Sequence, residues 1–168
     1  IEAEADRLYH IVEDLLALSR VEAGITSDGE PLLLQHVARP AISSEAQRWS
    51  SVTFEFDLPS DLPVVFAERT YVEQVLRNLA SNAGKYSPPD TVVTIQAEAT
   101  PSEVLVRVLD RGSGINADET ERLFDLHYRS PRTAGSVAGA GIGLYVCRGL
   151  VDAMGGAVWA RPRPGGGS

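Results

Sequence analysis

Hydrophobic residues near the beginning of the chain recur at intervals of three and four positions, the pattern of an amphipathic helix. They are Leu8, Ile11, Val12, Leu15, Leu16, Leu18 and Val21. Gly24 follows them as a typical helix stop. Because the hydrophobic stripe is wide, we expect this helix to pack against another helix or a second copy of itself, with an ordinary core helix as the alternative.

The rest of the chain mixes helical and alternating patterns without a regular strand–helix–strand order. Periods near 3.6 predict helices at 37–49, 71–86, 118–124 and 141–154. Alternation predicts strands at 52–58, 64–66, 91–99, 103–110 and 157–161, with the third and fourth joined as a hairpin. Residues 26–31 have the composition of a linker. This order favours an α+β fold, built as a two-layer sandwich.

The composition is that of one globular domain with a real core. The 168 residues are 43% hydrophobic, carry a formal net charge of -8 and include one cysteine, Cys147. A disulfide scaffold is therefore excluded, and the negative charge argues against nucleic acid as a main partner. Twelve of the fifteen glycines lie between Gly112 and Gly167, which is the first indication of a site.

Three polar side chains share a narrow stripe of the helix predicted at 71–86. Asn78, Asn82 and Lys85 lie along it, at the edge of the hydrophobic face. An amide offers a neutral carbonyl oxygen to Mg²⁺, and a lysine adds a positive charge suited to a phosphate. A solvated helix face or a pair of capping amides would give the same pattern, so the stripe alone leaves both interpretations open.

A first glycine-rich segment follows a predicted strand. Asp110 ends that strand, and Gly112 and Gly114 then permit a sharp turn and close backbone approach to a ligand. A carboxylate at this place can accept a hydrogen bond from an exocyclic amine such as that of adenine. Asp-x-Gly is also common in ordinary turns, so this segment is weak evidence by itself.

A second glycine-rich segment, residues 139–144, opens the helix predicted at 141–154. Backbone N–H groups at a helix N-terminus can cradle an anion. No strand leads into these glycines as a dinucleotide-binding fold requires, and no Gly-Lys-Ser/Thr follows as a P-loop requires. The preceding residues, 127–138, are rich in small and basic side chains, including Arg129 and Arg132, and resemble a mobile lid.

In order and spacing, these segments resemble the ATP-binding domain of bacterial sensor histidine kinases, within the wider family of gyrase and Hsp90-type ATPases. The resemblance rests on four motifs between Asn78 and Leu144. The N box is matched by Asn78-Leu79-x-x-Asn82-Ala83-x-Lys85-Tyr86, the first glycine box by Asp110-x-Gly112-x-Gly114, the F box by Leu123-Phe124 through Tyr128-Arg129, and the second glycine box by Gly139-x-Gly141-x-Gly143-Leu144. Residues 15–24 are similar to the end of the second dimerisation helix.

The resemblance implies a kinase domain that binds ATP and Mg²⁺. Asn82 would hold Mg²⁺ with Asn78 supporting it, and Lys85 and Arg129 would contact phosphate. Asn78, Lys85 and Arg129 are thereby the implied catalytic residues. The Asp110 carboxylate would bind the adenine amine. The other nucleotide contacts would come from Tyr86, Gly112, Gly114, Ile115, Phe124, Gly139, Gly141, Ile142, Gly143 and Leu144.

The resemblance also implies the fold, the domain limits and the partners. The expected fold is the α/β sandwich of these ATPases preceded by one long helix. Residues 1–24 would end dimerisation helix 2, 25–36 would be a linker, and 37–168 would be the ATP-binding domain without its last strand. The full-length protein would be a homodimeric, membrane-anchored bacterial sensor with this part in the cytosol. It would phosphorylate a histidine outside this chain for relay to a response-regulator aspartate.

The three histidines do not fit the phospho-acceptor pattern of that family, a His-Glu or His-Asp pair with a proline four residues after the acid. We expect His10, His36 and His127 to be surface or packing residues, and Glu73 to be a surface residue. A regulatory module that binds nucleotide weakly or not at all is the main alternative. A serine kinase of the anti-sigma type would lack the first helix, and a gyrase-like ATPase would need a carboxylate at Asn78.

Overall fold

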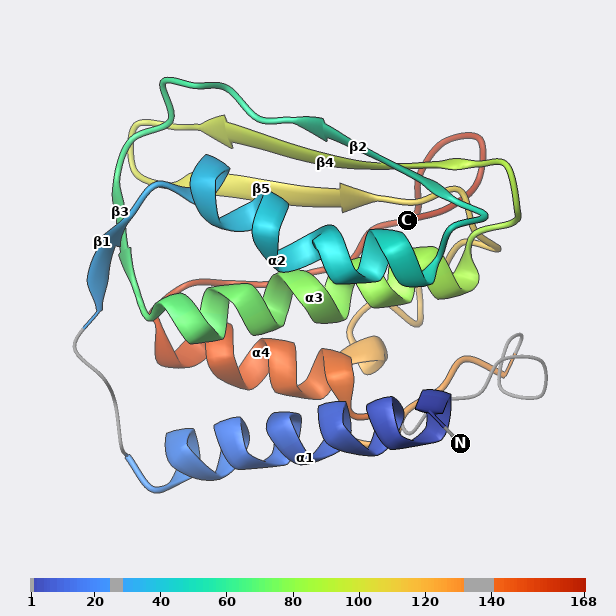
Figure 1. Cartoon of the computed structure of the whole chain (residues 1–168), viewed down its shortest axis with the longest axis horizontal. Helices are drawn as coiled ribbons and strands as arrows, with labels where there is room; N and C mark the ends of the chain where they lie inside the picture. Colours follow the sequence, from blue (N-terminus) through green and yellow to red (C-terminus); the bar gives the residue numbers. More distant parts are fainter. Residues whose placement is uncertain (1, 25–28, 132–140) are drawn as a thin grey trace.

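The computed structural model describes residues 2–24, 29–131 and 141–168, and it contains both helices and sheets (Figure 1). The helices are α1 (Glu2–Glu22), α2 (Leu34–Arg48), α3 (Arg69–Tyr86) and α4 (Gly143–Ala153), with a 3₁₀ turn η1 (Arg122–Phe124). The strands are β1 (Glu30–Leu32), β2 (Thr53–Asp57), β3 (Val65–Ala67), β4 (Val92–Ala99) and β5 (Val104–Leu109).

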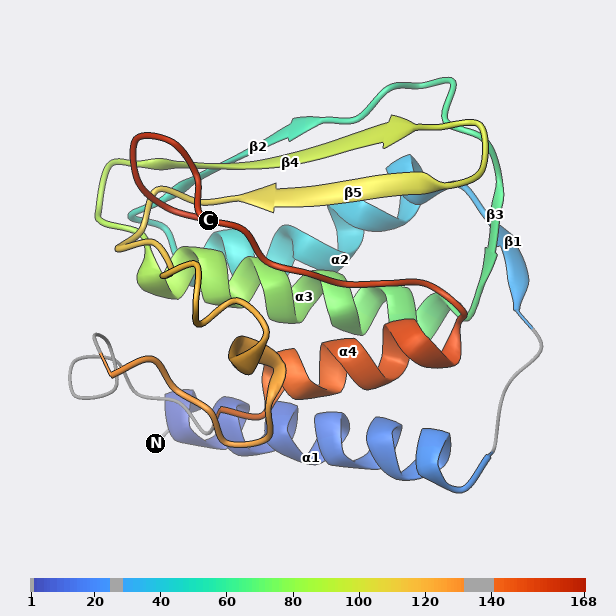
Figure 2. The same cartoon turned by 180° about the vertical axis from the view of Figure 1, so that it is seen from behind.

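The larger sheet has the strand order β2-β4-β5. Strand β4 is parallel to β2, with Thr53 opposite Val92, and antiparallel to β5, with Thr94 opposite Leu109. Helices α2 and α3 cover one face of this sheet in both views (Figures 1 and 2). The predicted hairpin and the two-layer α+β sandwich are thus confirmed.

Helix α3 takes part in two hydrophobic cores. The first core lies between the sheet and the helices α2 and α3, where Ile42, Leu76, Ala80, Val93 and Ile95 are buried together. Alternate side chains of β4 point into it, which is the period-2 pattern that predicted the strand. The second core lies between α1, α3 and α4, and its fully buried members come from α4.

Helix α1 is hydrophobic on two faces. Its inner face places Ala17 in the second core beside Val75 and Leu150, so the interpretation as a core helix holds for this face. Its outer face exposes Leu8, Tyr9, Val12, Leu15 and Leu16. These two faces together explain the wide hydrophobic stripe of the sequence. No helix within the described ranges combines the length and the hydrophobicity needed to cross a membrane.

The structure corrects the linker that was expected at residues 25–36. Strand β1 lies inside that range and pairs antiparallel with β3, with Leu32 opposite Val65, and α2 already begins at Leu34. A solvent-exposed ion pair of 2.8 Å between Glu30 and Arg69 connects β1 with the start of α3. A three-residue strand with a central proline carries no readable period, so only the non-local pairing reveals it.

Two other expected elements differ from the structure. Residues 157–161 are extended but belong to no sheet in the described part of the chain, and they run from the end of α4 along α3 toward the C-terminus (Figure 2). The prolines at 162 and 164 lack the N–H that a ladder needs, and Arg163 instead closes a turn with Gly167. The helix expected at 118–124 is reduced to the 3₁₀ turn η1 preceded by turns.

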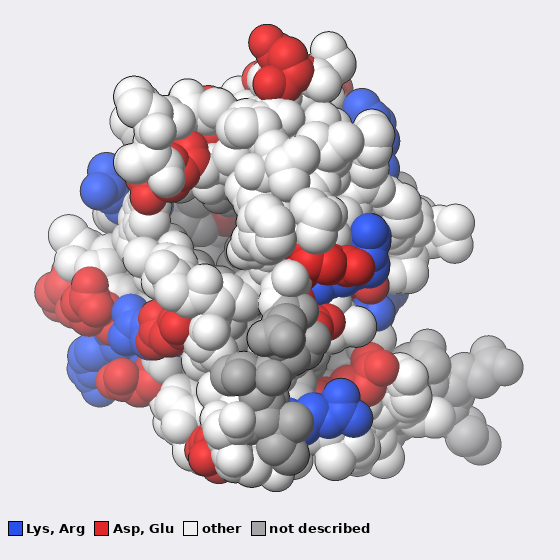
Figure 3. All heavy atoms as spheres, turned by 90° about the vertical axis from the view of Figure 1, so that its left-hand side faces the viewer, with Lys and Arg blue, Asp and Glu red and all other residues white. Residues whose placement is uncertain are grey.

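Charged side chains of both signs lie next to one another on the face formed around β1, β3 and the start of α3 (Figure 3). The ion pairs of Arg69 with Glu30 and Glu73 belong to this region. Glu73 is on the surface, as expected. His36 and His127 are exposed and His10 is half-buried.

Candidate nucleotide site

The polar stripe lies on α3, the helix that takes part in both hydrophobic cores. The helix begins after Glu68, whose carboxylate accepts a 3.0 Å hydrogen bond from the Thr70 N–H, and ends at Tyr86 because Ser87 precedes a proline and is extended. Val75 and Leu76 are buried on its two core faces, so the stripe lies at their border. Asn82 and Lys85 are both half-buried there.

Asn82 is the residue of the stripe best suited to a cation. Its half-buried amide has no hydrogen-bond partner among the residues that the structure describes. Lys85 follows almost one turn later, with its Nζ 5.0 Å from the centre of the Tyr86 ring. An amide oxygen and an ammonium group on one helix can serve a metal ion and the phosphates that share it.

The first glycine turn is pressed against the C-terminal end of α3. Asp110 is only 8% exposed, and its Oδ1 accepts a 2.7 Å hydrogen bond from the Gly112 N–H. A Cβ on Gly112 would lie 2.6 Å from the backbone oxygen of Tyr86, so only glycine fits this contact. The N box and the first glycine box are therefore in contact, as the interpretation of the sequence requires.

Ser168 is hydrogen-bonded to Asp110, and the sequence did not identify it as a site residue. Its hydroxyl donates a short hydrogen bond to Asp110 Oδ2, and its carbonyl accepts the Asp110 N–H at 2.9 Å. Gly167 has a φ of 93° and a Cβ there would overlap the Asp110 carbonyl. The glycine run 165–167 was the only signal in the sequence that the chain turns back on itself here.

The F box and the second glycine box are joined through their backbones. The N–H of His127 donates a 2.9 Å hydrogen bond to the carbonyl of Gly141. Gly141 has a φ of 69°, and a Cβ there would lie 2.9 Å from the Tyr128 carbonyl oxygen. Phe124 is 2% exposed, under the guanidinium of Arg148 at 4.4 Å from its ring centre. Phe124 therefore supports the site from the interior.

A buried carboxylate anchors the F box, and this residue was also missed in the sequence. Glu119 accepts 3.0 Å hydrogen bonds from the hydroxyls of Tyr128 and Ser130. Arg129 stands half-buried between these two anchored residues. Of the other predicted residues, Ile115 and Leu144 are half-buried near their glycines, whereas Gly139 and Arg132 lie outside the described residues.

The N-terminus of α4 faces the N box. A Cβ on Gly143 would be 3.5 Å from the Asn78 amide oxygen, so the absence of a side chain leaves space beside this amide. Ile142 packs into the second core with Val146, which leaves its backbone N–H rather than its side chain for a ligand. The start of α4 thus supplies the N–H groups and dipole end that favour an anion.

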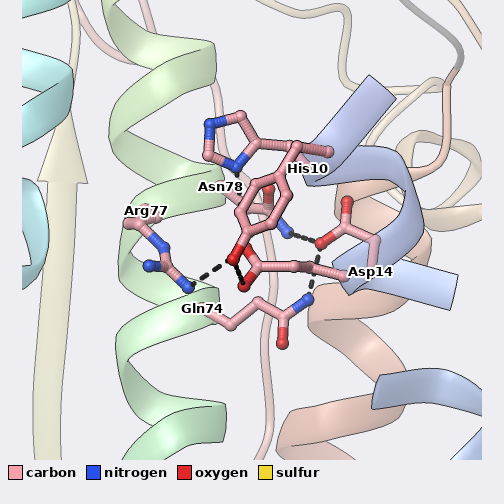
Figure 4. A network of polar contacts seen from close by, with 7 residues as sticks. His10, Asp14, Gln74, Arg77 and Asn78 are labelled. Carbon is pink, nitrogen blue, oxygen red and sulfur yellow. Dashed lines mark hydrogen bonds and ion pairs between the residues drawn. The ribbon is translucent and has the colours of Figure 1, made fainter. Parts of the chain in front are cut away.

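Asn78 is held by a residue of α1 that the sequence did not single out. The Asn78 Nδ2 donates to Asp14 Oδ1 at 3.0 Å, and the Gln74 Nε2 donates to the same oxygen at 2.7 Å (Figure 4). Burial raises the pKa of the Asp14 carboxyl, while the hydrogen bonds from Gln74 and Asn78 oppose that shift. Nearby, burial raises the pKa of the Cys147 thiol, which keeps it protonated.

The donor set fits Mg²⁺ bound together with a nucleotide. Within the described ranges no three side chains of histidine, cysteine, aspartate or glutamate converge on one point, so a cage made only of protein ligands is absent there. Mg²⁺ keeps several waters and is commonly bound by few protein oxygens plus substrate phosphates. An amide oxygen such as that of Asn82 suits this mode.

The asparagine-bearing stripe of α3 lies between two glycine-rich segments, and this arrangement is typical of a nucleotide-binding ATPase domain. The chain belongs to the family of histidine kinase-, DNA gyrase B- and HSP90-like ATPases, whose family model matches residues 67–168. The resemblance stated from the four motifs is therefore confirmed.

Individual relatives are sensor kinases. The chain is 33% identical to an adaptive-response sensory kinase SasA of Prochlorococcus marinus, over 100% of this chain and 45% of that protein. It resembles full-length ShkA in complex with AMPPNP, with a TM-score of 0.79 and 28% identity over 98% of this chain and 35% of that one.

A third similar structure is ThkA in complex with the response regulator TrrA, at a TM-score of 0.72 and 22% identity over 99% of this chain and 46% of that one. This likeness concerns the fold alone. The chain spans about half the length, or less, of these three proteins.

Proposed function

We propose that this chain is the ATP-binding catalytic part of a two-component sensor histidine kinase. The observation that carries the proposal is the position of Asn82 and Lys85 on α3, between the Asp110 turn and the start of α4. The motif-bearing segments come from distant parts of the sequence and meet around one helix. Membership of the ATPase family and the sensor-kinase relatives support the same function.

In the proposed reaction the chain mainly positions groups and neutralises charge. The γ-phosphorus of ATP forms a bond with an imidazole nitrogen as its bond to the β–γ bridging oxygen breaks, ADP leaves with that electron pair, and the imidazole loses a proton. Asn82 would hold Mg²⁺, and Lys85 and Arg129 would stabilise phosphate charge. Asp110 would accept the adenine amine at the oxygen that Ser168 now contacts.

The partners belong to the proposal as well. The phosphorylated histidine would lie on a helix of the full-length protein other than those described, and a response-regulator aspartate would receive the phosphoryl group. A homodimer and a membrane anchor in the full-length sensor are proposed from the family resemblance. ThkA, a protein of similar fold, is known in complex with a response regulator, which is consistent with such a partner.

The nucleotide site can be tested by calorimetry with a non-hydrolysable ATP analogue. We expect Mg²⁺-dependent binding to the chain and a loss of about tenfold or more in affinity for Asn82→Ala, because a metal ligand is removed. Glu73→Gln on the same helix is the matched control and should bind normally, since its side chain pairs with Arg69, at 4.0 Å, at the far end of the helix.

The same titration decides between a kinase domain and a regulatory module without nucleotide. Absence of Mg²⁺-dependent heat in the unmodified chain would favour the regulatory module. With radiolabelled ATP the chain should not label itself, because none of its three histidines has the acceptor pattern. Labelling of the isolated chain would show that one of them is an acceptor.

A further inference from the structure

One oxygen of Asp14 receives two amide donors from α3. Its Oδ1 accepts the Gln74 Nε2–H at 2.7 Å and the Asn78 Nδ2–H at 3.0 Å, across 64 residues of sequence in the second case (Figure 4). Asp14 is 7% exposed. Hydrogen bonds to a buried carboxylate are among the stronger ones in proteins, so this contact fixes the side chains that make it.

The contact decides which end of the Asn78 amide faces which way. A carboxylate oxygen only accepts hydrogen bonds, so Asn78 must direct its NH₂ group toward α1. Its carbonyl oxygen is then directed away from Asp14. The amide lies beside Gly143, with its oxygen 3.5 Å and its nitrogen 3.8 Å from the position that a Cβ on Gly143 would occupy, so the oxygen is the nearer of the two. The amide oxygen is therefore next to the glycine that opens α4.

We propose that Asp14 is a positioning residue that orients the Asn78 amide so that its oxygen, not its NH₂, serves the hydrated Mg²⁺ of a bound nucleotide. The inference rests on the proposed function, because it assigns a partner to a residue of that site. Waters bound to Mg²⁺ donate hydrogen bonds outward, and an amide oxygen accepts them whereas an NH₂ group would repel them. The Asn78 oxygen and the Asn82 oxygen, one turn apart, would then act on the same ion.

Packing of α1 keeps Asp14 in place. The Leu18 side chain rests on Gly149 of α4, where a Cβ would be 2.9 Å from Leu18 Cδ1, and Ala17 is buried in the second core. Glu13 lies 3.9 Å from Arg77 at the edge of the contact. The position of α1 is thereby linked to the orientation of a nucleotide-site residue.

The experiment compares Asp14→Asn with Asp14→Leu in the whole chain. Asparagine retains a carbonyl oxygen that can accept both amide donors, and leucine has a similar size but no acceptor. The dissociation constant of a non-hydrolysable ATP analogue is measured with Mg²⁺ and with EDTA. For Asp14→Leu we expect about tenfold weaker binding with Mg²⁺ and unchanged binding with EDTA, and for Asp14→Asn a change within about twofold in both.

Glu13→Gln is the control, since it alters the neighbouring carboxylate that contacts Arg77 and not Asn78. An equal loss with and without Mg²⁺ in Asp14→Leu would mean a structural role only and would overturn the inference. Equal losses in the asparagine and leucine variants would overturn it too, because the acceptor would then be irrelevant. If the unmodified chain binds no analogue with Mg²⁺, the proposed function itself fails, and this inference with it.

A second measurement does not depend on the leucine variant folding. The side-chain NH₂ resonances of Asn78, assigned by NMR in the unmodified chain, should move on Asp14→Asn much less than on Asp14→Ala. Addition of Mg²⁺ and the analogue should leave the Asn78 NH₂ protected from exchange, because it still faces Asp14. Loss of that protection on binding would contradict the proposed orientation.

Discussion

The backbone N–H of His127 donates a 2.9 Å hydrogen bond to the carbonyl of Gly141, and both residues have positive φ values, 62° and 69°. This one bond joins the F box to the start of α4. A positive φ is costly for residues other than glycine, so the chain tolerates it in His127 because the pairing holds it. The contact fixes the spacing of two segments of the nucleotide site.

We expect Gly141→Ala to weaken both the fold and the site. A Cβ there meets the His127 and Tyr128 backbones at 2.9 Å in addition to the unfavourable φ, so a loss of roughly 2–4 kcal/mol in the free energy of unfolding is expected. Gly155→Ala is the matched control, with a φ of 75° and nothing within 4 Å of its Cβ. It should lose about 1–2 kcal/mol. Urea unfolding of the two variants measures the difference, and equal losses would contradict the contact.

Asp110→Asn should change the base preference of the site. The NH₂ that replaces Oδ2 would repel the adenine amine but could donate to the oxygen that guanine carries in its place. We expect about tenfold weaker binding of an ATP analogue and a smaller preference for adenine over guanine nucleotides. Competition binding with both nucleotides provides the measurement, and Asp61→Asn in an exposed loop serves as control. An unchanged ratio would show that Asp110 does not contact the base.

The Asp14 carboxyl should make the stability of the chain depend on pH. Because burial raises its pKa in the folded state, folding takes up protons, and the stabilisation is full below the ordinary carboxyl pKa and lost as pH rises through the folded value. An asparagine at this position does not ionise, so Asp14→Asn removes the loss of stability at higher pH. The variant should therefore resist urea better than the unmodified chain at pH 7, and the difference should shrink as the pH falls. A constant difference between pH 4 and 7 would disprove the assignment, and Glu13→Gln controls for the loss of a nearby charge.

The outer face of α1 should mediate self-association of longer forms of the protein that include this helix. Leu16 is 56% exposed, so Leu16→Glu should alter monomer stability by no more than about 0.5 kcal/mol. Its neighbour Ala17 is 8% exposed, and Ala17→Glu should destabilise by several kcal/mol, because a charge would enter the second core. Sedimentation and urea unfolding distinguish the two effects. Unchanged association in Leu16→Glu would show that this face is not the interface.

The sequence predicted those features of the fold and the site that depend on residues close together in the chain. The stripe of Asn78, Asn82 and Lys85 follows from the helical period, and the β4–β5 hairpin follows from alternation on either side of a short turn. The glycines of the first box were correctly associated with a tight turn, because a φ such as the 72° of Gly114 restricts the residue type.

Contacts between distant segments could not be predicted in this way. In the sequence Asp14 is an ordinary polar position of an amphipathic helix, and only the packing of α1 with α4 in the second core brings it to Asn78. Ser168 gained its partner Asp110 only through the fold of the last residues. Strand β1 is defined by its pairing with β3, because its three residues are too few to show a period.

The sharing of α3 by both cores limits how the site can respond to a ligand. Leu76 and Ala80 are buried toward the sheet, and Val75 is buried toward α4, so α3 cannot rotate about its own axis without opening one core. Asn82 and Lys85 therefore keep the same orientation relative to the sheet. Nucleotides of different size would have to be accommodated by the segments around α3 rather than by movement of α3, which makes this helix the fixed reference of the domain.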